Sequence, residues 1–448
     1  MPALNPDLEK VYFEDKRYLE NTQVPIVTIS GTYREDLKDW HHLENNETDQ
    51  DIVFSRAHFS MALGVAVAAW ERQFDHKEAW IVDPTNFVSK DSWKSITLTE
   101  NIGKAIARHN WLKKVKEVFD KFGRKSLPIL DSIAPPLIYL TQEIEKPILS
   151  FHIAAGNLLV EQGKTVLQVI TDPHVRYDYL KHAGDEKLFY AVFDEKTQTD
   201  LLEQAKLIDQ PIDPNHVFVT GPPIDPRVVS LGRKKHPWRS GPIRLVITTG
   251  GLGTNKLEIL NLLDGLLPEL KKPEPKIKLV VYAGTHQDIA EAVKQKAHAY
   301  EVGVGELKNR KSKFRVIYHP QIFNANELLI KFGFGWADGF ITKPSGDMAY
   351  DAVASGNFLL TLSEWGEWEH NIREFFEQKG VSRVAQVDKI LAQILLLSQA
   401  EGHKGISWIE KAMLNTKRLE KSFYHGAKNI LQAYHQVEKL TQTTTSTS

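Results

Sequence analysis

The sequence predicts an α/β protein built from two parallel-sheet domains, and two observations support this. Short β-branched runs alternate with helical patterns along the chain, and most of these runs are continuously apolar, as in strands buried on both faces. The length of 448 residues suits roughly two or three domains of ordinary size. Alternating helices and buried strands are typical of parallel α/β layers.

The elements follow one another in a regular order. The predicted strands cover residues 24–30, 51–54, 79–82, 165–170, 216–219, 243–248, 278–282, 314–318 and 339–342. Helical apolar spacing lies between them, for example over 257–267 and 289–297. Residues 221–242 are rich in Pro, Gly and charge, which indicates a domain boundary. We therefore expect a first domain over 1–225, a hinge over 226–242, a second domain over 243–404, C-terminal helices over 405–440 and a disordered tail over 441–448.

Composition excludes several classes of function. The 56 basic and 57 acidic side chains balance to a formal charge of -1, which argues against nucleic-acid binding by bulk electrostatics. The absence of cysteine excludes disulfides, thiolate metal sites and thiol nucleophiles. The start of the chain lacks the apolar core of a signal peptide, and the longest apolar stretch, 61–70, is too short to cross a bilayer. We expect a cytoplasmic protein.

A glycine-rich turn follows the predicted strand 243–248. Thr249, Gly250, Gly251 and Gly253 lie between this strand and the next predicted helix. Glycines let backbone approach a ligand closely, and a helix start offers free N–H groups to a phosphate. The same pattern also fits a tight turn that needs a positive φ, and taken alone it does not separate the two interpretations.

A second turn has the same context after the predicted strand 339–342. Gly346 lies at the turn, Lys343 can face a phosphate, and Asp351 can accept both hydroxyls of a ribose. Taken singly, a solvated helix acid and a surface lysine explain these residues better. Two phosphate-friendly turns in one domain nevertheless predict a bound nucleoside diphosphate.

These motifs, in this order and spacing, resemble the GT-B glycosyltransferases of the branch that contains MurG, monogalactosyldiacylglycerol synthase and diacylglycerol glucosyltransferases. The resemblance covers roughly residues 150–385. The resembling segments of the second half are residues 249–253, 318–320, 337–346 and 351–356, followed by Asn371. Residues 170–173 and 219–225 match the family's middle segment, ahead of the hinge. The resemblance implies two Rossmann-like parallel-sheet domains facing a cleft, the GT-B architecture. It also implies that the second domain holds a UDP-linked sugar nucleotide.

The resemblance also implies roles for individual residues. The backbone around His319 meets the base, and Asp351 holds the ribose where the family usually has Glu. The donor-sugar segment reads Glu-Trp-Glu-His-Asn over 367–371, a departure from the family pattern that leaves the sugar identity open. The substrate-binding candidates are Thr249, Gly250, Gly251, Gly253, His319, Lys343, Ser345, Gly346, Asp347, Asp351, Glu367 and Asn371.

Catalytic candidates lie in the first half. The family carries a His after its first long strand, and His58, which follows the predicted strand 51–54, takes this position. Histidine suits a general base because its unperturbed pKa is near neutrality. Arg56 and Ala57 replace the family's glycines, and a helix-start His with structural hydrogen bonds is the alternative interpretation. Asp172, followed by His174, is a second candidate, although Asp172 can instead cap a turn.

A basic segment over residues 101–125 has eight Lys or Arg against two acidic residues, a net charge of +6. Apolar residues recur in it at near-helical spacing. Such a helix can lie on anionic lipid, which would make the protein peripheral on the inner face of the membrane. More often it packs its apolar stripe on its own domain.

The sequence as a whole predicts an inverting glycosyltransferase that moves a hexose from a UDP-sugar to the hydroxyl of a lipid or polyprenol-linked acceptor, with His58 as the base. We expect no metal and no cofactor beyond the UDP-sugar co-substrate, because no aspartate-rich metal motif is present. Two alternatives stay open. One is a sugar-nucleotide epimerase or hydrolase of the same architecture, and the other is an inactive nucleotide-sugar-binding protein.

Overall fold

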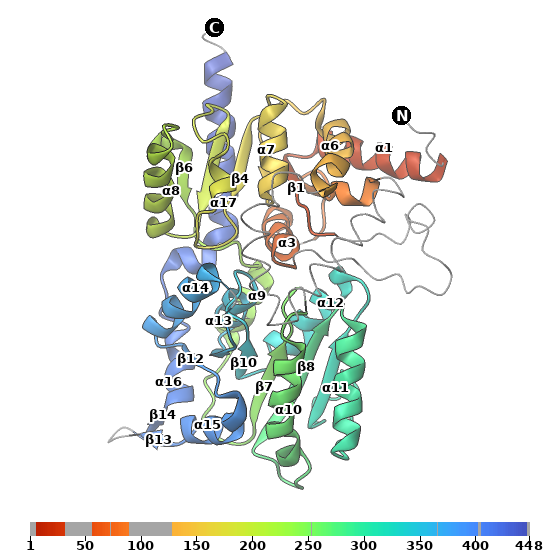
Figure 1. The fold of residues 1–448 in the computed structure, drawn as a ribbon, viewed down its shortest axis with the longest axis vertical. Helices are drawn as coiled ribbons and strands as arrows, with labels where there is room; N and C mark the ends of the chain where they lie inside the picture. The colour runs from red at the N-terminus through yellow and green to blue at the C-terminus, as the bar shows by residue number, and fades with distance from the viewer. Residues whose placement is uncertain are drawn as a thin grey trace. The chain divides into compact units, whose positions relative to one another are not determined.

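The structure, a computed structural model, describes residues 6–31, 56–71, 73–88, 128–251, 253–364, 366–401 and 405–445. The chain divides into two compact units (Figure 1). The first unit takes the chain up to Pro226 together with the segment from Ser422 onward, and the second unit is Arg227–Lys421. The predicted strand 51–54 and the basic segment 101–125 lie outside the described residues.

The first unit is built on a six-stranded sheet in the order β2-β1-β3-β4-β5-β6, in which every pair is parallel. Its strands are β1 (Val24–Val27), β2 (Ala79–Val82), β3 (Ile148–Ser150), β4 (Val166–Val169), β5 (Leu188–Val192) and β6 (Val217–Val219). Its α-helices are α1 (Pro6–Asn21), α3 (Arg56–Trp70), α6 (Pro128–Thr141), α7 (Ile153–Glu161), α8 (Glu195–Leu207) and α17 (Lys421–Thr445), the last beginning one residue before the unit boundary. Strands and helices bury one continuous apolar core.

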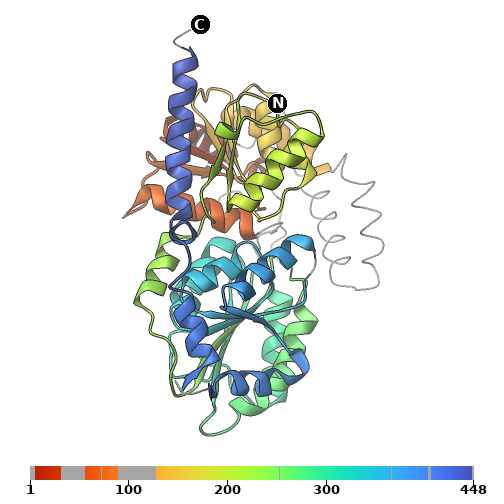
Figure 2. The same cartoon turned by 90° about the vertical axis from the view of Figure 1, so that its left-hand side faces the viewer.

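Helix α17 belongs to the first unit although it ends the chain, and it runs along that unit as the long blue helix of Figure 2. The Tyr434 hydroxyl donates to the carbonyl of Pro147 over 2.9 Å. A Cβ on Gly426 would lie 2.0 Å from the carbonyl oxygen of Pro222, so only glycine allows this approach. The helix continues to Thr445, so the predicted boundary at 440 is too early, since Thr441 keeps bonding to the preceding turn.

The second unit holds another six-stranded parallel sheet, in the order β12-β11-β10-β7-β8-β9. Its strands are β7 (Ile243–Thr248), β8 (Ile277–Gly284), β9 (Phe314–Tyr318), β10 (Gly339–Thr342), β11 (Phe358–Thr361) and β12 (Ser382–Val384), with a small hairpin of β13 (Ala400–Glu401) and β14 (Ile406–Ser407). Its α-helices are α9 (Pro226–Lys234), α10 (Lys256–Leu270), α11 (Gln287–Ala299), α12 (Ile322–Leu329), α13 (Met348–Ala354), α14 (Glu367–Gln378), α15 (Ile390–Leu397) and α16 (Trp408–Asn415), α9 beginning at the boundary residue. The predicted parallel α/β fold is confirmed in both units.

Strand order positions the candidate site. In the second sheet the chain moves outward from β7 through β8 to β9, then returns to the other side of β7 to place β10. In the first sheet the chain moves from β1 to β2 on one side and then returns to place β3 on the other side of β1, so the reversal lies between β1 and β3. Ligands of open α/β sheets bind at the carboxyl ends of strands at such switch points. The ends of β7 and β10, and those of β1 and β3, are therefore where function is expected.

Candidate functional site

The two turns predicted from the sequence meet at the switch point of the second sheet. Strands β7 and β10 are paired neighbours, and the Thr248 and Thr342 hydroxyls at their ends are hydrogen-bonded over 2.6 Å. A Cβ built on Gly250 would lie 3.9 Å from Cδ of Lys343, so the side chain of the second turn lies against the backbone of the first. Gly253 has a φ of 62°, which satisfies the tight-turn interpretation at that one position.

Two side chains that the sequence analysis missed contact the glycine turn. Asn255 accepts from the Gly250 N–H over 3.2 Å and donates to the Thr248 carbonyl over 3.1 Å. His286, the second residue after β8, places Nε2 2.9 Å from the Gly251 carbonyl oxygen. A polar residue following the strand next to β7 was the available signal, since adjacent parallel strands end at the same sheet edge.

The second turn places a buried ion pair at this edge. Lys343 Nζ lies 3.1 Å from Oε2 of Glu369 on α14, whereas Glu367, the residue predicted from the sequence, is exposed. Ser345 Oγ donates to Asp347 Oδ1 over 2.8 Å, at the start of α13. Lys343, Ser345 and the start of α13 thus bring polar groups together at the end of β10, with the lysine charge balanced by Glu369.

The remaining predicted residues of this unit lie on neighbouring elements. Asp351 is 7% exposed, one turn into α13, and Gly346 is buried. His319 follows β9, where its backbone N–H donates to Gly284 over 3.1 Å and its Nδ1 accepts from Gln321 over 3.1 Å. Asn371 is half-buried on α14.

In the first unit, His58 lies at the β1–β3 switch point. It is in the first turn of α3, and its Nδ1 is 3.3 Å from the carbonyl oxygen of Ile29, just past β1. Because a carbonyl only accepts, Nδ1 carries the proton and the lone pair is on Nε2, the tautomer of a general base. This bond also fits the alternative interpretation of a helix-start histidine with a structural hydrogen bond.

A second histidine adjoins His58. The His152 ring, at the end of β3, meets the His58 ring edge-to-face with centroids 4.9 Å apart. His152 Nδ1 accepts from the Ala154 N–H over 3.1 Å and so caps α7. Burial lowers the pKa of His152 well below its usual value, and repulsion from His58, when His58 is protonated, and from Arg176 lowers it further. His152 is thus a neutral ring with its proton on Nε2.

Asp172, the other predicted catalytic residue, follows β4 and is paired. Its Oδ2 accepts from Arg176 over 2.8 Å, and its side chain is 15% exposed. Its backbone carbonyl accepts from the His174 N–H over 2.7 Å. The carboxylate is therefore oriented by Arg176, which favours a positioning role over proton transfer.

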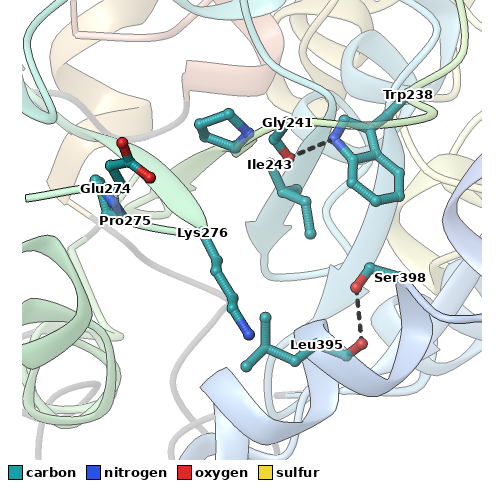
Figure 3. A pocket seen from close by; sticks show the side chains of 9 residues that line it. Trp238, Gly241, Ile243, Glu274, Pro275, Lys276, Leu395 and Ser398 are labelled. Atoms are coloured by element: carbon teal, nitrogen blue, oxygen red, sulfur yellow. Dashed lines mark hydrogen bonds between the residues drawn. The ribbon is translucent and has the colours of Figure 1, made fainter. Parts of the chain in front are cut away.

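Within the described ranges, no cluster of three or more His, Asp or Glu side chains is arranged to hold a metal ion. Nor does this part of the chain contain a helix with the length and apolar character to cross a membrane. A cavity of about 520 Å³ opens at the opposite edge of the second sheet, where β7 and β8 begin (Figure 3). Its lining includes Trp238, Ile243, Lys276 and Leu395 and none of the sequence-predicted site residues.

Comparison with known proteins finds likeness at the level of structure. No family model matches the chain. No curated protein matches it either. Os79 from O. sativa, solved in complex with UDP, is 9% identical, covers 92% of this chain and 100% of its own, and gives a TM-score of 0.53. A "putative UDP-N-acetylglucosamine 2-epimerase" from Listeria monocytogenes is 14% identical, covers 91% and 94%, and gives 0.50.

MurG from Acinetobacter baumannii is 12% identical over 91% of this chain and 98% of its own, with a TM-score of 0.45. The two likenesses at 0.50 and above show the fold, and the two six-stranded parallel sheets agree with it. The chain resembles the GT-B glycosyltransferases and has their architecture of two Rossmann-like α/β domains.

Proposed function

We propose that this chain is an inverting glycosyltransferase that transfers a hexose from a UDP-sugar to the hydroxyl of a lipid or polyprenol-linked acceptor. The observation that carries the proposal is the meeting of two turns at one switch point, with Gly250 against Lys343 and the Thr248–Thr342 hydrogen bond between them. The backbone N–H groups of a glycine turn, a lysine ammonium and the N-terminus of a helix are groups that bind a diphosphate.

Donor binding follows from the second unit. The Gly251 and Ser345–Gly346 backbone and Lys343 would contact the diphosphate, Asp351 the ribose, and the His319 segment the base. Glu369, Glu367 and Asn371 are the proposed contacts of the sugar hydroxyls. Support comes from the UDP complex of the similarly folded Os79.

In the proposed reaction, Nε2 of His58 takes the proton of the acceptor hydroxyl. The acceptor oxygen then attacks the anomeric carbon, the bond from that carbon to the diphosphate oxygen breaks, and UDP leaves with the electron pair. Direct attack inverts the anomeric centre. The charge that builds on the diphosphate is stabilised by Lys343 and the loop amides, the electrostatic contribution that is usually largest in catalysis.

Thermal shift with a panel of UDP- and GDP-sugars tests donor binding, since a ligand of the folded state raises the melting temperature. We expect UDP-sugars to stabilise the protein and GDP-sugars to leave it unchanged. No stabilisation by any UDP-sugar at millimolar concentration would contradict the proposal. Lys343→Ala should abolish the shift, and Lys379→Ala, a half-buried lysine after α14, should retain it.

An epimerase or hydrolase is the second candidate. It is favoured by Arg56 and Ala57 in place of the family's glycines and by the structural likeness to the Listeria protein. Incubation with a UDP-sugar and no acceptor separates the two reactions. Rapid UDP release that His58→Ala abolishes would support the second candidate, and release only on adding an acceptor would support the transferase.

A further inference from the structure

Two buried polar side chains bond the glycine turn after β7 on the side that faces the protein interior. Asn255 and His286 are each 4% exposed. Asn255 starts α10, and His286 starts α11 after the neighbouring strand β8. Burial of two polar side chains is unfavourable unless they are hydrogen-bonded, and each of the two is bonded to a backbone atom of the turn.

Asn255 lies at the N-cap position of α10, but its side chain does not cap the helix. An Asn at the first boundary of a helix normally accepts from that helix's own amides. Here its side chain makes no such bond and turns back instead, accepting from the Gly250 N–H and donating to the Thr248 carbonyl. The amide group therefore closes the turn across its base, and it leaves the amides of the first turn of α10 without this cap.

His286 holds the next residue. Its Nε2 is 2.9 Å from the Gly251 carbonyl oxygen, and because a carbonyl only accepts, Nε2 is the donor. Lys256 and Asp288, on the same two helices, form an ion pair of 2.8 Å that ties the helix starts together. The turn is thus held from two sides, by α10 and by α11.

A further bond, inside the turn, decides which donor faces outward. The Gly250 carbonyl is turned into the loop, where it accepts from the Gly253 N–H over 2.9 Å. In a trans peptide the C=O and the following N–H point in opposite directions. The Gly251 N–H is therefore directed away from the loop interior, as an anion contact requires.

We infer that Asn255 and His286 are positioning residues that orient the glycine turn for the diphosphate of the nucleotide. The inference rests on the proposed function, since it concerns the same donor site. Neither side chain touches the ligand. Both act through the backbone, so they affect binding of the phosphates and leave binding of the nucleoside unchanged.

The test compares uridine with UDP on the full chain by calorimetry. We expect Asn255→Ala and His286→Phe each to lower UDP affinity about tenfold, the loss of one oriented hydrogen bond, with uridine affinity unchanged. His286→Gln, which restores an N–H donor, should return UDP affinity to near wild type. His298→Phe, an exposed histidine of α11, is the matched control.

Melting temperatures verify folding. Asn255→Ser, which keeps a helix-capping hydroxyl too short to reach the turn, replaces Asn255→Ala where that variant does not fold, and His286→Leu likewise replaces His286→Phe. Unchanged UDP affinity in the Asn255 and His286 variants would overturn the inference, and so would equal losses for uridine and UDP. Wild-type protein that binds no UDP would refute the proposed function itself, a result distinct from either of these.

Discussion

The ammonium of Lys343 lies 3.1 Å from Oε2 of Glu369, and each side chain is only 9% exposed. The lysine that the second turn presents toward the glycine turn is thus already paired in the absence of a ligand. A buried pair of this kind is costly to break by removing one partner, because the other charge is left uncompensated. An incoming diphosphate would share Lys343 with Glu369.

Glu369→Gln separates these two roles of Lys343. Without ligand the variant should lose about 3–5 kcal/mol of stability, because the buried ammonium loses its counter-charge. UDP then supplies the missing negative charge, so saturating UDP should raise the melting temperature more in the variant than in wild type. Glu374→Gln, exposed on the same helix, is the control. Equal UDP-induced shifts in Glu369→Gln and wild type would refute a diphosphate contact for Lys343.

Asp351 is predicted to hold the ribose. Asp351→Ala should weaken UDP binding by about 1–3 kcal/mol, the usual cost of an unmatched hydrogen-bond partner. Removal of the ribose 2′-hydroxyl should cost wild type affinity but cost the variant much less, since the partner is already absent. Calorimetry with UDP and 2′-deoxy-UDP measures both effects. An identical preference for UDP in both proteins would rule out the ribose contact.

His152 should make the first unit sensitive to acid. Its folded-state pKa lies well below 6.5 through burial, then through the charges of His58 and Arg176. Below pH 6.5 the unfolded chain binds a proton that the folded chain does not. Stability is therefore complete above that pH and is lost as the pH falls toward the folded pKa, by up to about 1.4 kcal/mol per unit.

His152→Asn tests this slope while it keeps a side-chain oxygen to accept from the Ala154 N–H. Urea unfolding at several values between about pH 5 and 8 should show a smaller loss of stability on acidification in the variant than in wild type. His435→Asn, on the half-exposed face of α17, should behave as wild type. Parallel pH profiles for wild type and His152→Asn would show that His152 protonates freely in the folded state.

Lys235 anchors the second unit from inside. Its ammonium donates to the Phe334 carbonyl, the Ala337 carbonyl and Asn357 Oδ1 over 2.5, 2.7 and 2.6 Å. Lys235→Met leaves these acceptors unmatched and should cost about 3–5 kcal/mol. The neighbouring exposed Lys234→Met should change stability by less than about 0.5 kcal/mol. Similar denaturant midpoints for the two variants would show that the buried bonds contribute little.

The basic segment 101–125 predicts binding to anionic membranes. Vesicles with anionic lipid should retain the protein at low salt and release it at high salt, because salt screens the attraction of the +6 segment. Sedimentation of vesicles with bound protein measures retention. Replacement of Lys113, Lys114 and Lys116 by Gln should reduce it, and neutral vesicles serve as the control. Equal recovery in the supernatant at both salt concentrations would exclude this role.

Much of the fold could be predicted from local pattern. Strands β2, β7, β9 and β10 were predicted with their exact limits, because β-branched or aromatic apolar runs bounded by polar and turn residues mark a strand and its ends. Strands β3, β5, β11 and β12 were missed. Each has only three to five residues, and a run of that length cannot be told from a buried piece of helix by periodicity alone.

The candidate site was predicted less completely. Glu367 was chosen, yet Glu369 meets Lys343, since two residues along a helix face directions about 200° apart and the phase of α14 decides which one is buried. His286 was missed because it comes from the end of a different strand, β8. Asn255 lies in the glycine turn itself, and it was missed because the local pattern does not indicate that its side chain turns back onto Gly250.

Glycine spacing and strand–helix alternation therefore established two parallel-sheet domains and two phosphate-friendly turns, since both depend on backbone preferences that act over a few residues. Strand order and helix phase established which side chains meet at those turns. Lys343 and Glu369, or Gly251 and His286, lie some thirty residues apart in the chain, and their contact depends on which strands pair and which helix face is buried, properties of the folded core that no local pattern encodes.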